Sequence, residues 1–181
     1  ELDRLGHVHG PGSHPWLAQL RLVDAFVSRI AGVIAKDARS DISLVITSDH
    51  GMVLCPPGRR INIESHSVLA PDVRWVAGDP RARHIYTRPG SGPDVAARWR
   101  DVLGQDFDVV TRVDLADDGY FPYLDPDFSE RLGDFMVIAR SDALLASTSD
   151  SRSSSFLGQH GSMSVGEMRI PFRVFHSGAN G

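Results

Sequence analysis

The chain has 181 residues, of which 41% are hydrophobic and 23% are charged, and this composition indicates a globular protein rather than a disordered or fibrous one. Its formal net charge of −4 argues against a nucleic-acid partner, because phosphate backbones select basic surfaces. The single cysteine, Cys55, excludes an internal disulfide, and we interpret it as a buried, inert thiol because it follows an apolar run. No apolar run is long enough to span a bilayer, so no membrane segment is expected.

Residues 1–15 form a predicted loop that is rich in glycine, histidine and proline. Asp3 and His7 are four residues apart, and residues at this spacing share one face of a helical turn. Both could therefore reach one metal ion, and a glycine-rich connector with incidental histidines is the alternative. The chain opens within this segment and without a starting methionine, so we expect a piece of a longer protein.

A long amphipathic helix is predicted after this loop. Ser13 suits the N-cap and Pro15 suits the first turn. Apolar residues then recur at alternating steps of four and three, which favours a helix that packs one face against a sheet. A surface for a partner helix is the alternative. The residues of this apolar stripe are Trp16, Leu20, Val23, Val27, Ile30 and Ile34.

A short buried strand is predicted over residues 42–47, and it ends at Ser48-Asp49-His50-Gly51. In open α/β sheets, ligands bind just beyond the carboxyl ends of strands, and a glycine there permits a sharp turn. Asp49 and His50 are therefore candidate ligands, although Asp-His-Gly also occurs in plain turns. Loop, helix and strand together read as half of a βαβ unit, which favours the α/β class.

The pattern changes at Pro56, where a turn-rich stretch leads into short elements. We expect strands at 73–77, 84–87, 107–113 and 135–139, and a helix that begins at Pro93 and ends at Gly104. This order indicates a small α+β insert. Its basic residues could contact an anion, but a solvated surface explains them equally well and no role is assigned to them: Arg59, Arg60, His66, Arg81, Arg83 and His84.

Residues 146–155 are dominated by serine and threonine, and we expect a mobile surface loop there. The sequence Gln159-His160-Gly161-Ser162 follows, and a histidine at the end of such a loop is well placed to close over a site. Ser164 and Glu167 have the spacing of a capping box, which predicts the start of a short helix. Residues 170–175 are predicted to form a last core strand.

Five residues are thus candidate metal ligands, since carboxylate oxygen and imidazole nitrogen suit zinc and similar divalent ions. Asp3, His7 and His160 would make a three-ligand site with an open position, the usual form of a catalytic zinc. Asp49 and His50 would be half of a second site. Two metal ions roughly 4 Å apart can clamp both the attacking and the leaving oxygens in phosphoryl transfer.

Three motifs, in this order, resemble the alkaline phosphatase superfamily, and most closely its type I phosphodiesterase and nucleotide pyrophosphatase branch. They are Asp3-Arg4-Leu5-Gly6-His7 followed by Gly10-Pro11, then Ser48-Asp49-His50-Gly51-Met52, and then Gln159-His160-Gly161-Ser162. The resemblance implies an α/β fold that is part of an alkaline-phosphatase-like core sheet flanked by helices. Residues 1–55 and 156–181 would form the metal-binding part of the catalytic core, and residues 56–155 the α+β insert.

The resemblance also implies two divalent metal ions, expected to be Zn²⁺. Asp3, His7 and His160 match the ligands of one, while Asp49 and His50 match those of the other, which also uses an upstream Asp and a Thr or Ser nucleophile. In the family that hydroxyl attacks a phosphodiester or nucleotide substrate, forming a phospho-enzyme that water hydrolyses.

The segment that carries the nucleophile has no counterpart here. We therefore expect the C-terminal part of a catalytic domain, with the missing N-terminal half as its partner. The alternatives are another hydrolase of the superfamily, such as a phosphonate hydrolase or a phosphomutase-like enzyme, a non-catalytic metal-binding module, and an α/β domain with incidental surface histidines.

Overall fold

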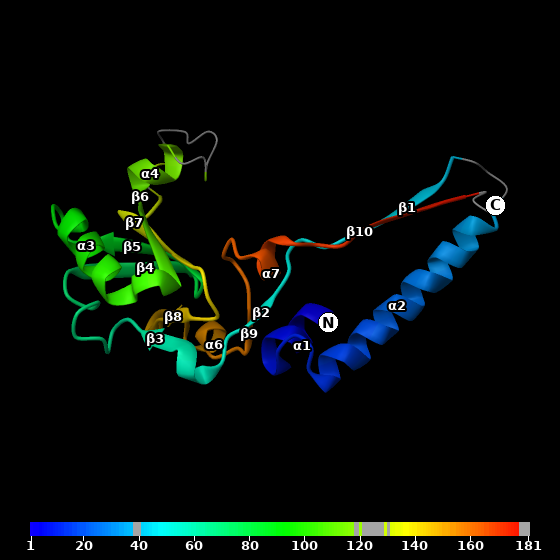
Figure 1. The fold of residues 1–181 in the computed structure, drawn as a ribbon, viewed down its shortest axis with the longest axis horizontal. Coiled ribbons are helices and arrows are strands. Elements are labelled where there is room, and N and C mark those ends of the chain that lie inside the picture. Colours follow the sequence, from blue (N-terminus) through cyan, green and yellow to red (C-terminus); the bar gives the residue numbers. More distant parts are fainter. Residues whose placement is uncertain (38–40, 118–119, 121–128, 130, 178–181) are drawn as a thin grey trace.

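The computed structural model describes residues 1–37, 41–117, 120, 129 and 131–177. The chain has a mixed α/β fold in two parts (Figure 1). One part is a lobe built around a four-stranded sheet, which we call the sheet lobe. The other is an arm made of a long helix and a pair of strands, which we call the apolar arm. A short helix and a small pair of strands lie between the two.

The first two helices are α1 (Leu2–His9) and α2 (His14–Ala35). They are separated by Gly10, whose φ of 84° lies in the left-handed region that glycine adopts readily. The N-cap of α2 is Ser13 and a proline lies in its first turn, as predicted. Helix α2 contacts strands β1 and β10, but only Ala31 of this helix is buried, and Leu20 and Val23 of the predicted apolar stripe are exposed.

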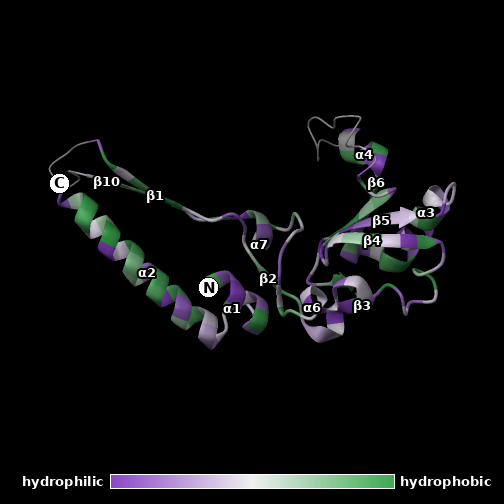
Figure 2. Cartoon of the chain, turned by 180° about the vertical axis from the view of Figure 1, so that it is seen from behind, coloured by the Kyte–Doolittle hydropathy of each residue, from purple (hydrophilic) through white to green (hydrophobic). Residues whose placement is uncertain are grey.

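The apolar arm is completed by β1 (Ser43–Thr47) and β10 (Phe172–His176), which pair antiparallel from Ser43↔His176 to Thr47↔Phe172. The prediction that these are buried core strands is wrong for this chain, because Val45 is 50% and Phe172 is 72% exposed. Phe26 of α2 is 65% exposed as well. Hydrophobic residues run along both α2 and β1 in Figure 2, and no described segment covers them from the other side.

The sheet lobe contains β4 (Val73–Asp79), β5 (Ala82–Thr87), β6 (Phe107–Thr111) and β7 (Phe135–Ala139), in the antiparallel order β4-β5-β7-β6. Helix α3 (Gly92–Leu103) packs on one face and ends at Gly104, as predicted. Trp99 of α3 is fully buried against Phe135, and its indole N–H donates to the Leu69 carbonyl at 3.1 Å. The strand predicted to reach residue 113 ends at Thr111, where α4 (Arg112–Asp117) begins.

Short elements connect the sheet lobe to the rest of the chain. Strands β2 (Val53–Leu54) and β9 (Gly158–Gln159) pair antiparallel, and β3 (Arg60–Asn62) and β8 (Leu144–Ala146) pair parallel. The remaining elements are the 3-10 turns η1 (Pro57–Arg59), η2 (Gly104–Asp106) and η3 (Thr148–Asp150), and the helices α6 (Ser151–Ser154) and α7 (Val165–Met168). None of the helices in the described part of the chain is long and apolar enough to cross a membrane.

The segment 146–155, predicted to be a mobile surface loop, instead contains η3 and α6, although about half of its residues are exposed as expected; its mobility stays a prediction. Ser147 and Ser154 are buried, and α6 occupies four residues of this segment. The Ser147 hydroxyl donates to Glu64 at 2.5 Å, and the Ser154 hydroxyl donates to Asp150 at 2.9 Å. The buried hydroxyl groups of these serines thus find hydrogen-bond partners, which composition alone could not reveal.

A solvated surface is also the wrong interpretation for two of the six basic residues, since Arg81 and Arg83 are 0% and 1% exposed. The Arg83 guanidinium donates to the Leu145 carbonyl at 3.0 Å and forms an ion pair of 2.7 Å with Asp150. It therefore fixes the segment after β8 to the sheet. Burial raises the pKa of the Asp150 carboxyl, but the hydrogen bonding and charge of Arg83, together with hydrogen bonds from Ser153 and Ser154, leave this pKa below its ordinary value.

Candidate metal centre

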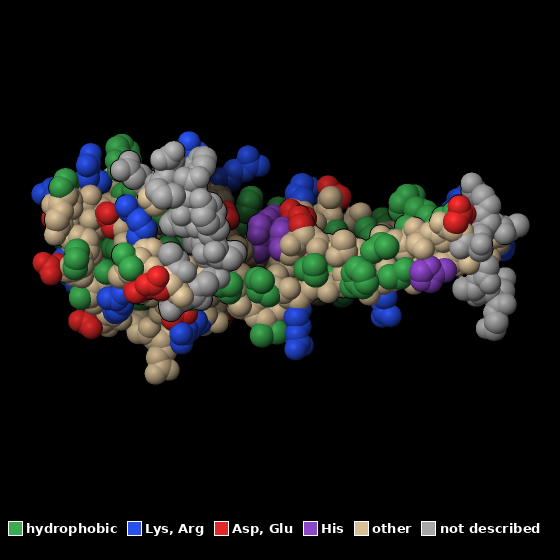
Figure 3. All heavy atoms as spheres, turned by 90° about the horizontal axis from the view of Figure 1, so that it is seen from above, with side chains coloured by type: hydrophobic (Ala, Val, Ile, Leu, Met, Phe, Trp, Pro, Cys, Tyr) green, Lys and Arg blue, Asp and Glu red, His purple; other side chains and the backbone are tan. Residues whose placement is uncertain are grey.

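The five predicted ligands come from three separate segments. Asp3 and His7 lie one turn apart on α1, Asp49 and His50 follow β1, and His160 directly follows β9. The structure brings ligand atoms of Asp3, His7 and His160 within 4.8 Å of one another. Figure 3 shows histidine side chains gathered beside acidic ones between the two parts of the molecule. This is the one group of three or more candidate ligands within the described residues.

His7 is oriented by strand β9. Its Nδ1 lies 2.8 Å from the carbonyl oxygen of Gly158, and its own carbonyl accepts a hydrogen bond of 2.8 Å from the Leu157 N–H. Because a carbonyl can only accept, Nδ1 of His7 donates the hydrogen bond, and Nε2 is the ring nitrogen that remains available to a ligand. That Nε2 faces Asp3 at 3.4 Å. A backbone carbonyl on the other ring nitrogen is the usual support of a metal-binding histidine.

Glycines in or beside the motifs allow close contacts around the site: Gly158, directly before the third motif, lies against α1, and Gly51 of the second motif lies against α7. A Cβ built on Gly158 would lie 2.2 Å from the Gly6 oxygen and 2.5 Å from Met52 Sδ. A Cβ built on Gly51 would lie 2.1 Å from the Gly166 oxygen. These glycines are therefore required by contact between segments, and the motifs keep the ligand-bearing segments together as well as supplying the ligands.

Replacing Gly158 with alanine is expected to weaken both folding and the metal centre. The added methyl group would overlap backbone of α1, and such overpacking costs about 1–3 kcal/mol of stability. Thermal unfolding and zinc titration should both report a loss. Gly58→Ala is the matched control, because a Cβ at Gly58 meets nothing within 4 Å. Equal behaviour of the two variants would contradict this account of the contact.

Asp49 and His50 lie directly beside the three converging residues. His50 Nδ1 is 2.8 Å from the Gly51 oxygen, which again leaves Nε2 free, 3.7 Å from Asp49 and 4.0 Å from Asp3. The His50 ring stacks on His160 at 3.6 Å between centroids and 17° between planes. The Asp3 carboxylate thus lies near both His7 and His50.

The electrostatics favour the ligand forms of these groups. Burial lowers the pKa of His160, and the neighbouring His50 and His7 lower it further, against the opposing effect of Asp79 and Asp3. His160 is therefore neutral at neutral pH, which is the form that coordinates metal. A hydrogen bond from its own backbone N–H and the charge of His50 lower the pKa of the Asp49 carboxyl.

A buried ion pair holds the segment after His160. Arg81 lies in the turn between β4 and β5, and its guanidinium contacts Glu167 at 2.6 Å and 2.8 Å with both side chains at most 1% exposed. The same carboxylate accepts hydrogen bonds from the Ser162 N–H at 3.1 Å and from the Ser164 hydroxyl. The Ser162 hydroxyl donates to the Ala139 carbonyl of β7. The sheet lobe thereby fixes the backbone two residues beyond His160.

Arg81 and Glu167 are positioning residues that sequence reasoning missed. The sequence alone assigns no role to Arg81, and it indicates only a helix-capping role for Glu167. Hydrogen bonds from Arg81 and Ser164 outweigh the opposing effect of burial and keep the pKa of the Glu167 carboxyl low. Cys55 lies beneath this pair and is fully buried, and burial raises the pKa of its thiol. This agrees with the predicted inert cysteine.

The residues present fit a divalent metal ion. Three converging groups offer one carboxylate oxygen and two imidazole nitrogens, and the Asp3 side chain remains 56% exposed on the open side. Three protein ligands with one side open to solvent is the form of a catalytic rather than a structural zinc site.

Comparison with solved structures identifies the fold. Murine ectonucleotide pyrophosphatase / phosphodiesterase 5 is similar with a TM-score of 0.74 and 18% identity, over 97% of this chain and 44% of that one. Phosphonoacetate hydrolase from Sinorhizobium meliloti 1021, solved with phosphonoformate, gives a TM-score of 0.67 and 18% identity, over 98% of this chain and 45% of that one. The chain therefore spans less than half the length of these structures, and the predicted alkaline-phosphatase-like α/β fold is confirmed.

Sequence comparison identifies the family. The GPI ethanolamine phosphate transferase 1 of Aspergillus oryzae is 33% identical over 119 residues, which are 64% of this chain and 11% of that protein. The profile of the type I phosphodiesterase / nucleotide pyrophosphatase family matches residues 1–163. That match confirms the resemblance seen in the three motifs, and this chain belongs to the type I phosphodiesterase / nucleotide pyrophosphatase family.

Proposed function

We propose that this chain is the C-terminal part of the catalytic domain of a metal-dependent phosphodiesterase or nucleotide pyrophosphatase. The enzyme would hydrolyse phosphodiester or phosphoanhydride bonds in a nucleotide or other small-molecule substrate. The observation that carries the proposal is the convergence of Asp3, His7 and His160 from separate segments to within 4.8 Å. Membership of a family of hydrolases supports the reaction class.

Asp3, His7 and His160 would hold one divalent ion, and Asp49 and His50 would contribute to a second; we propose zinc for both. Bound ions of this kind neutralise charge on phosphate oxygens and lower the pKa of a nucleophilic hydroxyl. The chain itself supplies orientation. Gly158 and Gly51 direct the Nε2 atoms of His7 and His50 outward, and the Glu167 carboxylate fixes the loop that carries His160.

The nucleophile of the proposed reaction, a Thr or Ser hydroxyl, would come from an N-terminal half that packs on the apolar arm. Two observations support this part of the proposal. The similar structures are more than twice as long as this chain. Large apolar side chains of the arm are exposed on α2, β1 and β10, among them Phe26, Val45 and Phe172. Such a contiguous apolar surface is typical of an interface.

We also propose that residues 56–155 are an insert in a core made of residues 1–55 and 156–181. Strands β2 and β9 support these boundaries, because they pair Leu54 with Gly158 at the points where the segment leaves and returns. The insert would act on the metal centre through its contacts with the loop after His160, including the one made by Arg81, and through the charge of Asp79 near His160.

A phosphonate hydrolase is the second candidate, favoured by the similarity to phosphonoacetate hydrolase. A transferase is a related possibility, given the name of the Aspergillus oryzae relative. All three activities would use the same ligands, because the family's chemistry is phosphoryl transfer and differs in the leaving group and acceptor. The substrate assay below separates them.

The decisive experiment compares the complete protein with the isolated 181-residue chain on a chromogenic phosphodiester and a phosphonate. We expect metal-dependent phosphodiester hydrolysis by the complete protein, loss of activity with a chelator, and recovery with zinc. The isolated chain should be inactive and should bind one zinc ion more tightly than a second, since it supplies three ligands to one site and two to the other.

Three results would contradict the proposal. Metal-dependent turnover by the isolated chain would show that the nucleophile lies within it. Activity of the complete protein that survives chelation would remove the metal centre from the mechanism. Preferential cleavage of the phosphonate, or transfer of phosphate to an acceptor other than water, would replace the proposed reaction with one of the alternatives.

A further inference from the structure

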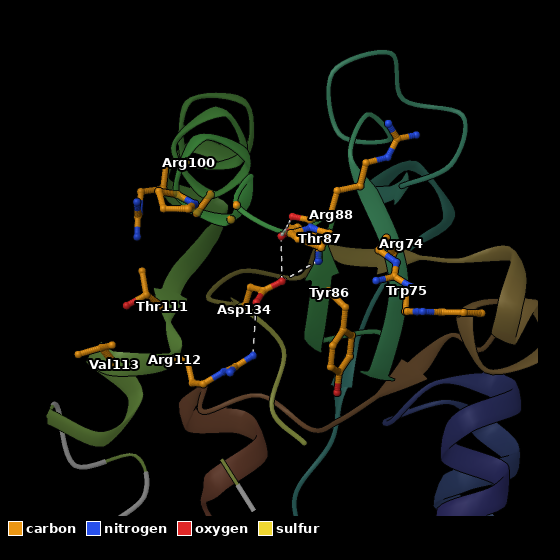
Figure 4. Close-up of a pocket in the computed structure, with 15 residues that line it drawn as sticks. Arg74, Trp75, Tyr86, Thr87, Arg88, Arg100, Thr111, Arg112, Val113 and Asp134 are labelled. Atoms are coloured by element: carbon orange, nitrogen blue, oxygen red, sulfur yellow. Dashed lines mark hydrogen bonds and ion pairs between the residues drawn. The ribbon is translucent and has the colours of Figure 1, made fainter. Parts of the chain in front are cut away.

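A cavity of about 690 Å³ lies at one end of the four-stranded sheet. Figure 4 shows it between β4 and β5 on one side and β6 and the first turns of α3 on the other. Its lining residues come from the sheet lobe, and the metal-ligand candidates are not among them. Four arginines but a single carboxylate, Asp134, line the cavity, although the chain as a whole has a net charge of −4: Arg74, Arg88, Arg100 and Arg112.

The carboxylate in this cavity is already engaged. Asp134 Oδ2 accepts hydrogen bonds from the Thr87 N–H at 2.7 Å and from the Thr87 hydroxyl at 2.8 Å, and Oδ1 lies 3.3 Å from Arg112 (Figure 4). Arg112 also donates to the Gly133 carbonyl at 3.1 Å. These contacts hold Asp134 in place at the base of the cavity. Its carboxylate is already shared between Thr87 and Arg112, so it does little to neutralise the other arginines.

Positive charge above this floor is poorly compensated. Arg100 donates a hydrogen bond of 3.1 Å from Nε to the Val109 carbonyl, and this contact leaves its terminal nitrogens available to a ligand. Arg88 is 73% exposed, and Asp72 lies 3.9 Å from it, a distance at which an exposed pair contributes little. Gly92 and Pro93, which also line the cavity, begin the twelve-residue helix α3, and the positive end of its dipole adds to the field.

An aromatic pair forms another wall of the cavity. Trp75 of β4 is 67% exposed, although burial of such a side chain is strongly favourable. Trp75 and Tyr86 are direct partners across the antiparallel strands, so their side chains share one face of the sheet. The Tyr86 hydroxyl donates to the Arg131 carbonyl at 2.5 Å, which fixes its ring. An exposed indole beside a fixed phenol ring can stack on a planar ligand.

We propose that this cavity binds a small ligand of the mononucleotide class, with a phosphate group held by the arginines and a planar ring held by Trp75. Guanidinium groups match the oxygens of a phosphate in geometry and charge. The volume is that of an ordinary small-molecule pocket. The proposal goes beyond the proposed function, since it concerns a second site that performs no chemistry.

The test uses the complete protein with His160→Ala, which disables the metal centre, and three probes at physiological ionic strength. AMP carries phosphate and ring, adenosine carries the ring alone, and inorganic phosphate carries the charge alone. We expect AMP to bind in calorimetry and to quench tryptophan fluorescence, with adenosine and phosphate each at least about tenfold weaker. Trp75→Leu should weaken the binding of AMP. It should also remove the quenching, because the other two tryptophans, Trp16 and Trp99, lie outside the cavity.

Arg74→Gln and Arg100→Gln, in the same background, should each weaken AMP about tenfold, as expected for loss of a charge-assisted contact. Arg140→Gln is the matched control and should change nothing, because Arg140 is a 62% exposed arginine of the sheet lobe that does not line the cavity. AMP binding equal to that of phosphate, absent binding, or binding insensitive to Arg74, Arg100 and Trp75 would overturn the proposal. None of these results bears on the hydrolase activity, which is measured with the intact metal centre.

Discussion

His160→Ala is expected to lower the metal-dependent hydrolase activity of the complete protein about a thousandfold, roughly 4 kcal/mol of transition-state stabilisation. His160 is one of the three side chains that converge, and the other two, Asp3 and His7, both lie on α1. Without His160 the site keeps ligands from one helix only, so metal affinity should fall with activity. Zinc content after dialysis and turnover of a phosphodiester measure the two effects.

His9→Ala is the matched control for this prediction. His9 is an exposed histidine on the same helix and is not part of the converging group. It should leave activity and zinc content unchanged. An active, zinc-loaded His160→Ala protein, or an equal loss in both variants, would show that the three-residue assignment is wrong.

The second large effect is expected at the buried ion pair. Arg81→Met should destabilise the protein by about 3–5 kcal/mol, because it leaves the Glu167 carboxylate buried without its partner. The Ser162 N–H also bonds to this carboxylate, so the loop behind His160 should loosen and metal affinity should fall as well. Chemical denaturation and zinc titration measure the two losses.

Arg81→Met with Glu167→Met should be more stable than Arg81→Met alone, since replacing both partners removes the unpaired buried charge. Arg140→Met is the control, because the Arg140 side chain is 62% exposed and its pair with Asp108 should contribute less than about 1 kcal/mol. A double variant as unstable as the single one would contradict the ion-pair explanation.

The Arg81–Glu167 pair should also make the stability of the folded protein depend on pH. The pKa of Glu167 is lower in the folded protein than in the unfolded chain, so its contribution to stability is complete above about pH 4.3, the unfolded pKa of a glutamate. It is lost as the pH falls through the lower folded value. The double variant should therefore lose less stability than the unmodified protein over the acid range below about pH 4.3.

Local patterns predicted much of this fold. Helix α2, helix α3 with its end at Gly104, and the fully buried strand β7 follow from periodicity, caps and composition, which depend on neighbouring residues. Burial was less predictable. Residues of β1 and β10 are apolar but exposed, because what covers a strand depends on segments beyond it. The helical turns of the serine-rich segment were not predictable, because its hydroxyls bond to partners distant in sequence such as Glu64.

For the candidate site, too, the sequence predicts one part and not the other. Motif spacing was enough to select Asp3, His7 and His160, which the structure brings together, and to place Asp49 and His50 as neighbours. The supporting contacts were not predictable. Arg81 approaches Glu167 across 86 residues of sequence, and nothing near Arg81 in the sequence distinguishes it from the chain's other arginines. Partners at this range become visible only when the fold is known.

Pairing of β2 with β9 has a consequence for assembly of the metal centre. His7 and Gly158 are 151 residues apart, and closing a flexible loop of that length would cost conformational entropy that grows with its logarithm. Once the sheet lobe has folded, however, the chain between Leu54 and Gly158 starts and ends at adjacent points. The folded lobe then replaces a long flexible loop by a short rigid connection, so bringing His160 to α1 should cost much less conformational entropy. If the sheet lobe folds first, the metal ligands should therefore come together faster than they would across an unfolded loop.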